Sequence, residues 1–318
     1  MDMFEEEAAM RSMINTSTMR RLKRNSPLIT MALPGVLFFL AFCYGPMFGI
    51  LIAFKDYNYV QGILGSDWVG FKNFEFLFSS GAAWSITRNT LYYNSLFIIT
   101  GTIMAIGVAL LLNEITSKLL RGILQSSMMI PYFISWIVVS AFTYALFNAQ
   151  NGLLNPILES FNLRPVDWYT DGTYWPLILV IISAWKTVGF NSIIYLAAIL
   201  GINREYYEAA EIDGANKWRQ AFSITLPHIQ PLVIILTILA IGKIFYADFG
   251  MFYFLTNQSG LLLPVTDVID TYVFRTLQVT GDVGMASAAG FYQSIVGFIL
   301  VLLTNYAVRK IDHENALF

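Results

Sequence analysis

Residues 203–227 read NREYYEAAEIDGANKWRQAFSITLP, a polar stretch between two long apolar runs. Small and acidic side chains recur there at helical spacing, with Ala209 and Asp213 one turn apart. Gly214 is expected to stop this first helix, and Pro227 suits the first turn of the apolar run that follows. The stretch therefore predicts two short helices joined by a turn, rather than a plain connection between membrane helices.

The same stretch resembles the EAA signature of ABC-importer permeases. Glu208-Ala209-Ala210 is followed by three residues, Gly214, nine residues and Ile224-x-Leu226-Pro227. In that family the segment is the coupling helix, which docks into a cleft of the ATP-hydrolysing subunit. An ordinary amphipathic loop with a glycine stop is the alternative. The resemblance implies coupling roles for Tyr207, Glu208, Ala209, Ala210, Asp213, Gly214, Leu226 and Pro227.

The composition favours a membrane protein. Of 318 residues, 56% are hydrophobic and 13% are charged, whereas a soluble domain has about 25% charged residues. The single cysteine excludes an intramolecular disulfide, and the two histidines do not complete a zinc ligand set. We therefore expect no metal site.

Six apolar runs are close to or above the roughly 20 residues that cross a bilayer core as a helix. They predict an all-α polytopic protein, and the resemblance implies the type I ABC-importer permease fold over 27–308. The first run is too long for a signal core and is expected to bend at its prolines and glycines. The expected spans are 27–54, 86–112, 122–147, 174–200, 228–246 and 285–308.

The remaining segments are expected to be tails and loops. Residues 1–26 and 309–318 are polar tails, and 55–84, 148–173 and 248–284 are longer connections. With both termini inside, twelve basic residues fall on the inner side and five on the outer side, as the positive-inside rule requires. This orientation places 203–227 in the cytoplasm of a bacterial cell, where an ATPase partner would be. The inner set is Arg11, Arg20, Arg21, Lys23, Arg24, Lys118, Arg121, Arg204, Lys217, Arg219, Arg309 and Lys310, and the outer set is Lys55, Lys72, Arg88, Arg164 and Arg275.

Two lysines lie within apolar runs, where a charge costs at least ~2.5 kcal/mol on insertion scales. Lys186 is followed by Gly189 and Asn191, and Lys243 precedes Tyr246 and Asp248. Either lysine can line a path for polar solutes, or can snorkel or pair with a neighbouring helix. Aromatic and amide side chains in the spans suit sugars. The candidates for the path are Tyr92, Asn94, Trp136, Tyr144, Lys186, Asn191, Tyr195, Lys243, Tyr246 and Asp248.

The last third resembles the polysaccharide-import branch related to the maltose-transporter permeases. The resemblance rests on Asp248-Phe249-Gly250-Met251-Phe252-Tyr253, Asp270-Thr271-Tyr272-Val273-Phe274-Arg275 and the run 281–290. It implies carbohydrate import, a second permease subunit, two ATPase subunits that bind ATP and magnesium, and an extracellular solute-binding protein.

No phosphate-binding loop, dinucleotide motif or nucleophile–base pattern occurs, so we expect no cofactor and no chemistry on this chain. The basic residues indicate topology and not nucleic-acid binding. Two alternatives to an ABC permease stay open: a secondary transporter driven by an ion gradient, and an intramembrane enzyme or receptor. The second of these lacks a catalytic constellation.

Overall fold

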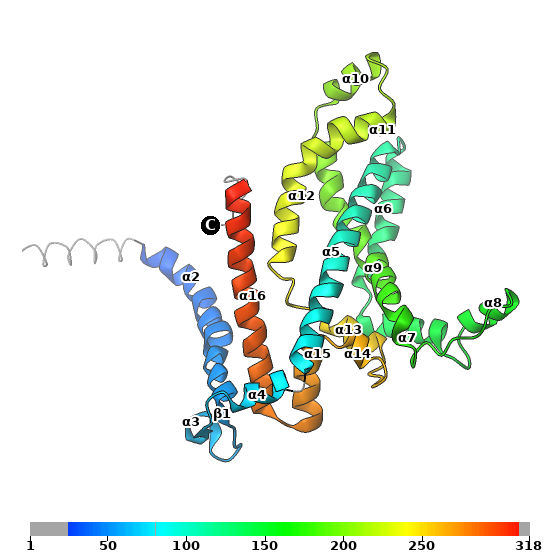
Figure 1. Cartoon of the computed structure of the whole chain (residues 1–318). Coiled ribbons are helices and arrows are strands. Elements are labelled where there is room, and N and C mark those ends of the chain that lie inside the picture. The colour runs from blue at the N-terminus through cyan, green and yellow to red at the C-terminus, as the bar shows by residue number, and fades with distance from the viewer. Residues whose placement is uncertain (1–24, 80, 312–318) are drawn as a thin grey trace, which may run out of the picture.

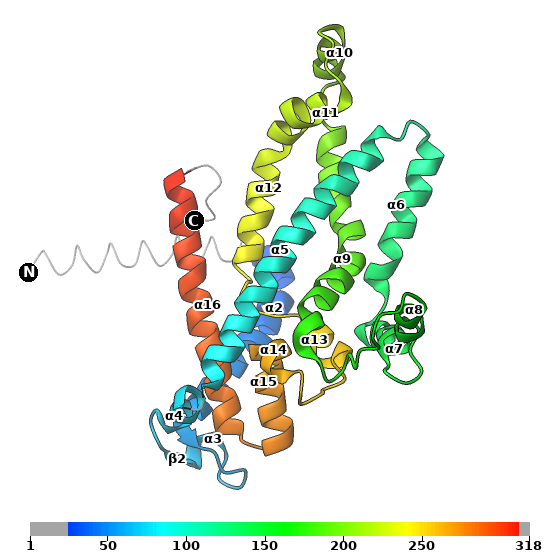
Figure 2. The same cartoon turned by 45° about the vertical axis from the view of Figure 1, so that its right-hand side comes forward.

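Helices, long and short, make up most of the described chain (Figure 1). The computed structural model describes residues 25–79 and 81–311, so most of the two expected tails lies outside the described residues. The longest helices run along the molecule. The short helix α10 (Arg204–Ile212) stands at one end and α4 (Lys72–Ser79) at the other (Figures 1 and 2).

Five helices of the described chain are long and apolar enough to cross a membrane, and a sixth span results if one bent pair counts as one. The all-α polytopic fold is confirmed. The fifth span begins at Lys217 rather than His228 and ends at Ile241 rather than Tyr246. The five single helices are Ser26–Phe54, Ala82–Glu114, Gly172–Leu200, Lys217–Ile241 and Val283–Tyr306.

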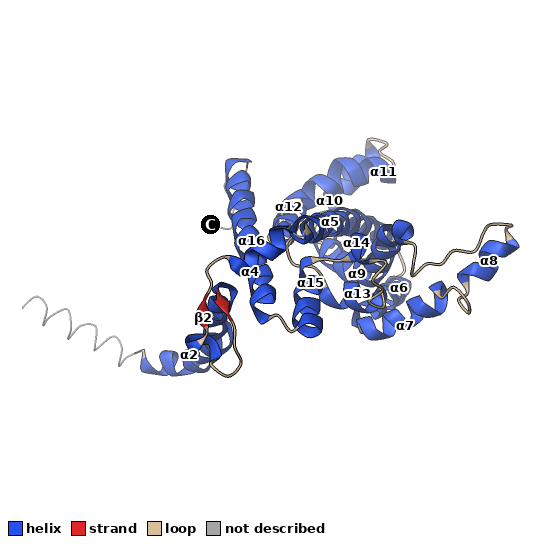
Figure 3. Cartoon of the chain, turned by 60° about the horizontal axis from the view of Figure 1, so that its bottom comes forward, coloured by secondary structure: helices blue, strands red, loops and turns tan. Residues whose placement is uncertain are grey.

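The first span changes helix type along its length. It passes from α2 (Ser26–Phe39) through a π-turn, η1 (Leu40–Tyr44), into a 3-10 segment, η2 (Gly45–Phe54). α2 buries none of its side chains and stands away from the other helices (Figure 3). η2 packs on α16 (Val283–Ile311), which anchors the second half of the span.

The segment after the first span is folded, where the sequence predicted an interfacial loop. It contains β1 (Lys55–Asp56), α3 (Gly62–Gly65), β2 (Asp67–Trp68) and α4, and the two strands pair antiparallel. The side-chain amide of Asn73 donates hydrogen bonds to the carbonyl oxygens of Ala53 and Lys55, both at 3.0 Å. These bonds fix α4 against the end of the first span.

Three helices form the centre of the bundle: α5 (Ala82–Glu114), α9 (Trp175–Leu200) and α12 (Leu226–Ile241). α5 and α9 pack along much of their length, and α12 contacts both. Ala105 and Ala109 of α5 are fully buried in this contact. Small side chains let membrane helices approach closely, which explains their place at this interface.

The third expected span, 122–147, is not one continuous helix but a bent pair of helices. α6 (Lys118–Phe133) and α7 (Trp136–Phe147) are bent by 95° at the break. Pro131 lacks a backbone N–H, and the Ser135 hydroxyl accepts a hydrogen bond from the N–H of Val138 to begin α7 anew. α7 leads into α8 (Leu154–Ser160) and η3 (Gly172–Tyr174), inside the expected connection.

The stretch 248–284 was expected to be a loop and is largely helical. It contains α13 (Phe249–Leu255), α14 (Leu263–Thr266), α15 (Ile269–Arg275) and the π-turn η5 (Thr276–Thr280). Leu255, Val268 and Ile269 are fully buried, so this part belongs to the core. Its helices are short, which is why hydropathy over a membrane-length window misses them.

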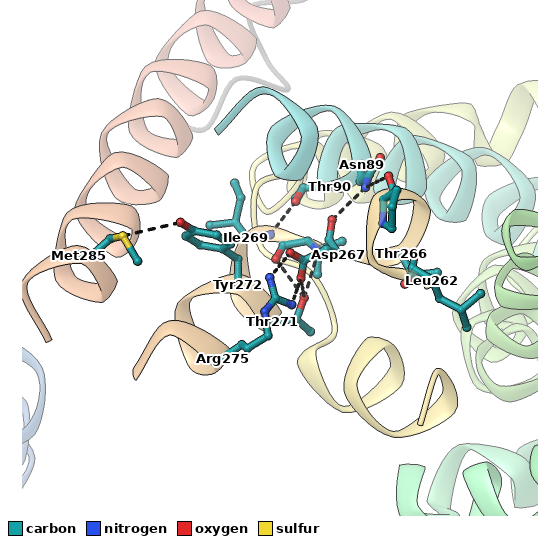
Figure 4. A network of polar contacts seen from close by, with 12 residues as sticks. Asn89, Thr90, Leu262, Thr266, Asp267, Ile269, Thr271, Tyr272, Arg275 and Met285 are labelled. Carbon is teal, nitrogen blue, oxygen red and sulfur yellow. Dashed lines mark hydrogen bonds and ion pairs between the residues drawn. The ribbon is translucent and has the colours of Figure 1, made fainter. Parts of the chain in front are cut away.

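Polar contacts attach this part to α5 (Figure 4). The Asn89 side chain donates to the carbonyl oxygen of Asp267 at 3.0 Å, and the N–H of Ile269 donates to Thr90 Oγ1 at 3.1 Å. The Asp267 carboxylate accepts two hydrogen bonds from the Arg275 guanidinium, at 2.9 and 2.5 Å. α14 and α15 are thus held against the second span.

Candidate functional site: a docking helix and a membrane cavity

The 203–227 segment has the expected order of helix, glycine turn and helix. The Asn203 side chain caps α10 by accepting a hydrogen bond from the N–H of Glu205 at 3.1 Å. Gly214 has φ +77°, a left-handed conformation that non-glycine side chains seldom adopt. The second helix is continuous with the fifth span, through α11 (Lys217–Gln220) and the π-turn η4 (Ala221–Thr225). The π-turn lies directly before Pro227, whose missing N–H disturbs regular α-helical bonding.

Most of α10 is open to solvent. None of its residues is buried, and it projects at the end of the molecule (Figure 2). Glu208, Ala209, Asp213 and Gly214 are exposed. Ile212 is 88% exposed, a large apolar side chain on a protruding helix. Such a surface suits contact with a partner protein.

Other residues of the predicted coupling set hold α10 in place. The hydroxyl of Tyr207 is 2.9 Å from Thr225 Oγ1, which joins α10 to the start of the fifth span. Leu226 packs in the α5–α9–α12 core. The Lys217 ammonium donates a hydrogen bond to Glu211 at 2.8 Å and so lowers the pKa of that carboxyl. Residues with the same role that sequence reasoning missed are Thr225, Glu211 and Gln220, which contact their partners only after the chain turns at Gly214.

A polar groove adjoins α10. It has a volume of about 600 Å³ and lies between this helix and the turn that joins α5 to α6. Charged side chains of both signs line it, so it suits a partner with a mixed charged surface. They are Glu114, Lys118, Arg121, Arg204, Glu208, Glu211 and Lys217.

A second cavity lies among the membrane helices. Its volume is about 400 Å³, and its walls come from α5, α9, α12 and the turn after α12. Half of the predicted path residues line it: Asn94, Asn191, Tyr195, Lys243 and Tyr246. Sequence reasoning missed three hydroxyl residues of the lining, Thr102, Ser183 and Thr187. In the sequence these residues show only as polar side chains in an apolar run. Such side chains often donate to a carbonyl of their own helix instead, as the Thr187 hydroxyl does to the Ser183 carbonyl at 2.8 Å.

The other five predicted path residues lie outside this cavity. Tyr92 lines a separate pocket beside Arg88, and the Tyr144 ring packs against Tyr169 at 5.7 Å between centroids. The last three form a cluster at the break in the third span. There Trp136 Nε1 donates to the Asp248 carboxylate at 2.8 Å, and the Lys186 ammonium lies 5.1 Å from the centre of the Trp136 ring.

Lys186 is buried, and its ammonium closes the broken end of α6. It donates hydrogen bonds to the carbonyl oxygens of Pro131 at 3.1 Å and Tyr132 at 2.8 Å, and also to that of Ile134. A lysine ammonium has three N–H donors, so these bonds use all of them. The arrangement is that of a cap, which satisfies carbonyls that the break leaves without helical partners.

No group of three or more metal-binding side chains occurs within 25–79 and 81–311. The polar side chains of the membrane cavity are amides, hydroxyls and one amine, which bind by hydrogen bonds and charge. The arrangement can therefore hold a polar solute.

Three comparisons place the chain among known proteins. The family model of the binding-protein-dependent transport system inner membrane component matches residues 98–313. Protein LplB of Bacillus subtilis is 36% identical over 94% of this chain and 93% of its own. The polygalacturonan/rhamnogalacturonan transport system permease protein YteP of the same organism is 35% identical over 93% of this chain and 91% of its own.

Solved structures agree with the sequence relatives. One chain of the crystal structure of a bacterial ABC transporter that imports the acidic polysaccharide alginate superposes with a TM-score of 0.84 and 33% identity. The superposition covers 93% of this chain and 99% of that one. A second structure holds the alginate transporter in complex with an alginate pentasaccharide-bound periplasmic protein, and matches with a TM-score of 0.82.

Proposed function

The chain belongs to the family of inner membrane components of binding-protein-dependent transport systems, and we propose that it is the permease subunit of an ATP-driven importer of oligo- or polysaccharides. The observation that carries this proposal is the cavity with polar groups that α5, α9 and α12 line, at the far end of α12 from the exposed helix α10 (Figure 1). One element, the fifth span, connects the solute cavity to the docking helix. A movement of α10 can therefore be transmitted to the cavity along this helix.

A carbohydrate fits the cavity lining. Amides and hydroxyls match the hydroxyl groups of a sugar, and the exposed Tyr246 ring offers an apolar face. The names of the relatives, which refer to polygalacturonan, rhamnogalacturonan and alginate, support a glycan as the solute. The chain itself acts as a path and performs no covalent chemistry.

The expected partner subunits follow from the proposal that each permease chain supplies one docking helix to one ATPase. We expect a second permease subunit, two ATPase subunits that bind ATP and magnesium, and a solute-binding protein that delivers the sugar. Closure of the ATPases would move α10 and switch the cavity from one side of the membrane to the other. Such a switch requires that ATP and the loaded binding protein favour different states. The basic residues beside α10 support a cytoplasmic position for that end of the bundle.

The test is uptake by the whole complex. The transporter is purified through a tag on this chain, reconstituted in vesicles and supplied with its binding protein and labelled glycans. We expect an ATPase to co-purify and uptake to require ATP. Uptake driven by an ion gradient without ATP would instead establish the secondary-transporter alternative.

A further inference from the structure

The two lysines that the sequence places in apolar runs differ in their surroundings. The ammonium of Lys186 is fully used by three backbone carbonyl oxygens and lies near the Trp136–Asp248 pair. The side chain of Lys243 is exposed to the cavity and makes no hydrogen bond or ion pair with any described residue. An ammonium with no partner among the described residues of its own chain is free to bind an anionic group that comes from outside.

The cavity around Lys243 carries one charge. Of the described residues that line it, only Lys243 is ionised at neutral pH, and none is a carboxylate. The other polar groups, those of Asn94, Thr102, Ser183, Thr187, Asn191, Tyr195 and Tyr246, are neutral. The lining therefore carries a net positive charge, which favours an anionic solute.

The backbone that carries Lys243 is held by three other elements. The Asn94 amide of α5 donates to the carbonyl of Ile244 at 2.7 Å, and the Gln293 amide of α16 donates to that of Phe245 at 2.7 Å. The Asp270 carboxylate of α15 accepts from the N–H of Ala247 at 2.8 Å. A turn fixed on three sides presents its lysine at a defined place, which lowers the entropy lost on binding.

We propose that Lys243 binds a carboxylate of the transported solute, so that the cavity selects acidic oligosaccharides such as those built from uronic acids. The inference rests on the proposed function of sugar import. The ammonium would form a charge-assisted hydrogen bond with the carboxylate, while Tyr246, three residues further along the same turn, contacts the sugar ring. A neutral sugar would leave the ammonium without a charged partner.

The experiment compares two glycans that differ only in charge: a uronic-acid oligosaccharide and its methyl-esterified form. Initial rates of ATP-driven uptake by the reconstituted complex are measured for wild type, Lys243→Gln and Lys243→Arg. The binding protein is the same in all assays, so its own preference cancels in each variant-to-wild-type ratio. We expect Lys243→Gln to lower uptake of the acidic glycan roughly ten-fold or more, to leave the ester within about two-fold, and Lys243→Arg to retain the preference.

Two controls sharpen this result. Lys72→Gln removes one positive charge from α4, outside the cavity, and is expected to leave both ratios unchanged. Lys243→Cys in a Cys43→Ala background, treated with an aminoethylating reagent, restores an ammonium at the site and should restore uptake of the acidic glycan.

Three outcomes would overturn the proposal. An equal loss for both glycans would assign Lys243 to an ion pair with the second permease or to folding. Unchanged uptake of both would remove it from the binding site. Loss of acidic-glycan uptake in Lys243→Arg as large as in Lys243→Gln would show that the charge at this position does not select the solute, whereas a wild type that transports neither glycan would contradict sugar import itself.

Discussion

Gly189 of α9 lies directly against the backbone of Met128 in α6. A Cβ atom built on Gly189 would come within 1.8 Å of the Met128 carbonyl oxygen and 2.4 Å of its carbonyl carbon. Backbone atoms inside a packed helix pair have little room to move, so this contact sets how close α6 and α9 lie.

Gly189→Ala should therefore destabilise the bundle, although alanine is the better helix former. We expect a cost at or above the upper end of the roughly 1–3 kcal/mol that overpacking causes, measured as a lower thermal unfolding midpoint in detergent. Gly107→Ala in α5 is the matched control, because no atom lies within 4 Å of the Cβ position there. Equal stability of the two variants would contradict the close approach.

Lys186→Met should loosen the break between α6 and α7. Three carbonyl oxygens lose their donor, and we expect a loss of roughly 2 kcal/mol or more in the free energy of unfolding. Since Lys186 lies outside the membrane cavity, transport of every solute should fall by a similar factor. Uptake rates for a panel of glycans test whether the factor is uniform. A change in the order of preferred solutes would instead assign Lys186 to the solute path.

Gly214→Leu should uncouple the transporter from its ATPase. At φ +77° a branched side chain is strained by roughly 1–2 kcal/mol, so the turn after α10 would change shape. Open space surrounds the Cβ position, so the protein should still insert and fold. Co-purification of the ATPase with the tagged chain is expected to fall sharply. Gly214→Asn, which tolerates the left-handed region, should retain most of it.

Asp267→Asn should weaken the connection between the end of α14 and α15. The substitution removes the charge partner of the Arg275 guanidinium, which is 34% exposed, so we expect a modest loss of about 1–2 kcal/mol. Hydrogen exchange of 262–280 is the measurement, with faster exchange expected there than in α5. An Asp267→Asn/Arg275→Met double variant that is as stable as Asp267→Asn alone would show that the pair accounts for the effect.

Local patterns in the sequence were enough for the membrane class, the approximate places of most spans and the helix–glycine–helix shape of 203–227. Hydropathy and turn residues act within one helix length, so they can be interpreted without knowing which elements pack against each other. The break at Ile134 was not predictable in this way, because an apolar run with an internal proline looks the same in a kinked helix and in two helices. The short buried helices after Asp248 were not predicted, because they are shorter than the membrane-length window over which hydropathy is averaged.

The different roles of the two membrane lysines were decided by the tertiary structure. The sequence offered both as candidates for a solute path, since each is a charge within an apolar run. Only the packing of α9 against α6 places carbonyl acceptors around Lys186, and only the turn held by Asn94 leaves Lys243 facing a cavity. A charge in a membrane is compensated by whatever the fold brings near it, and a sequence alone does not contain those distances.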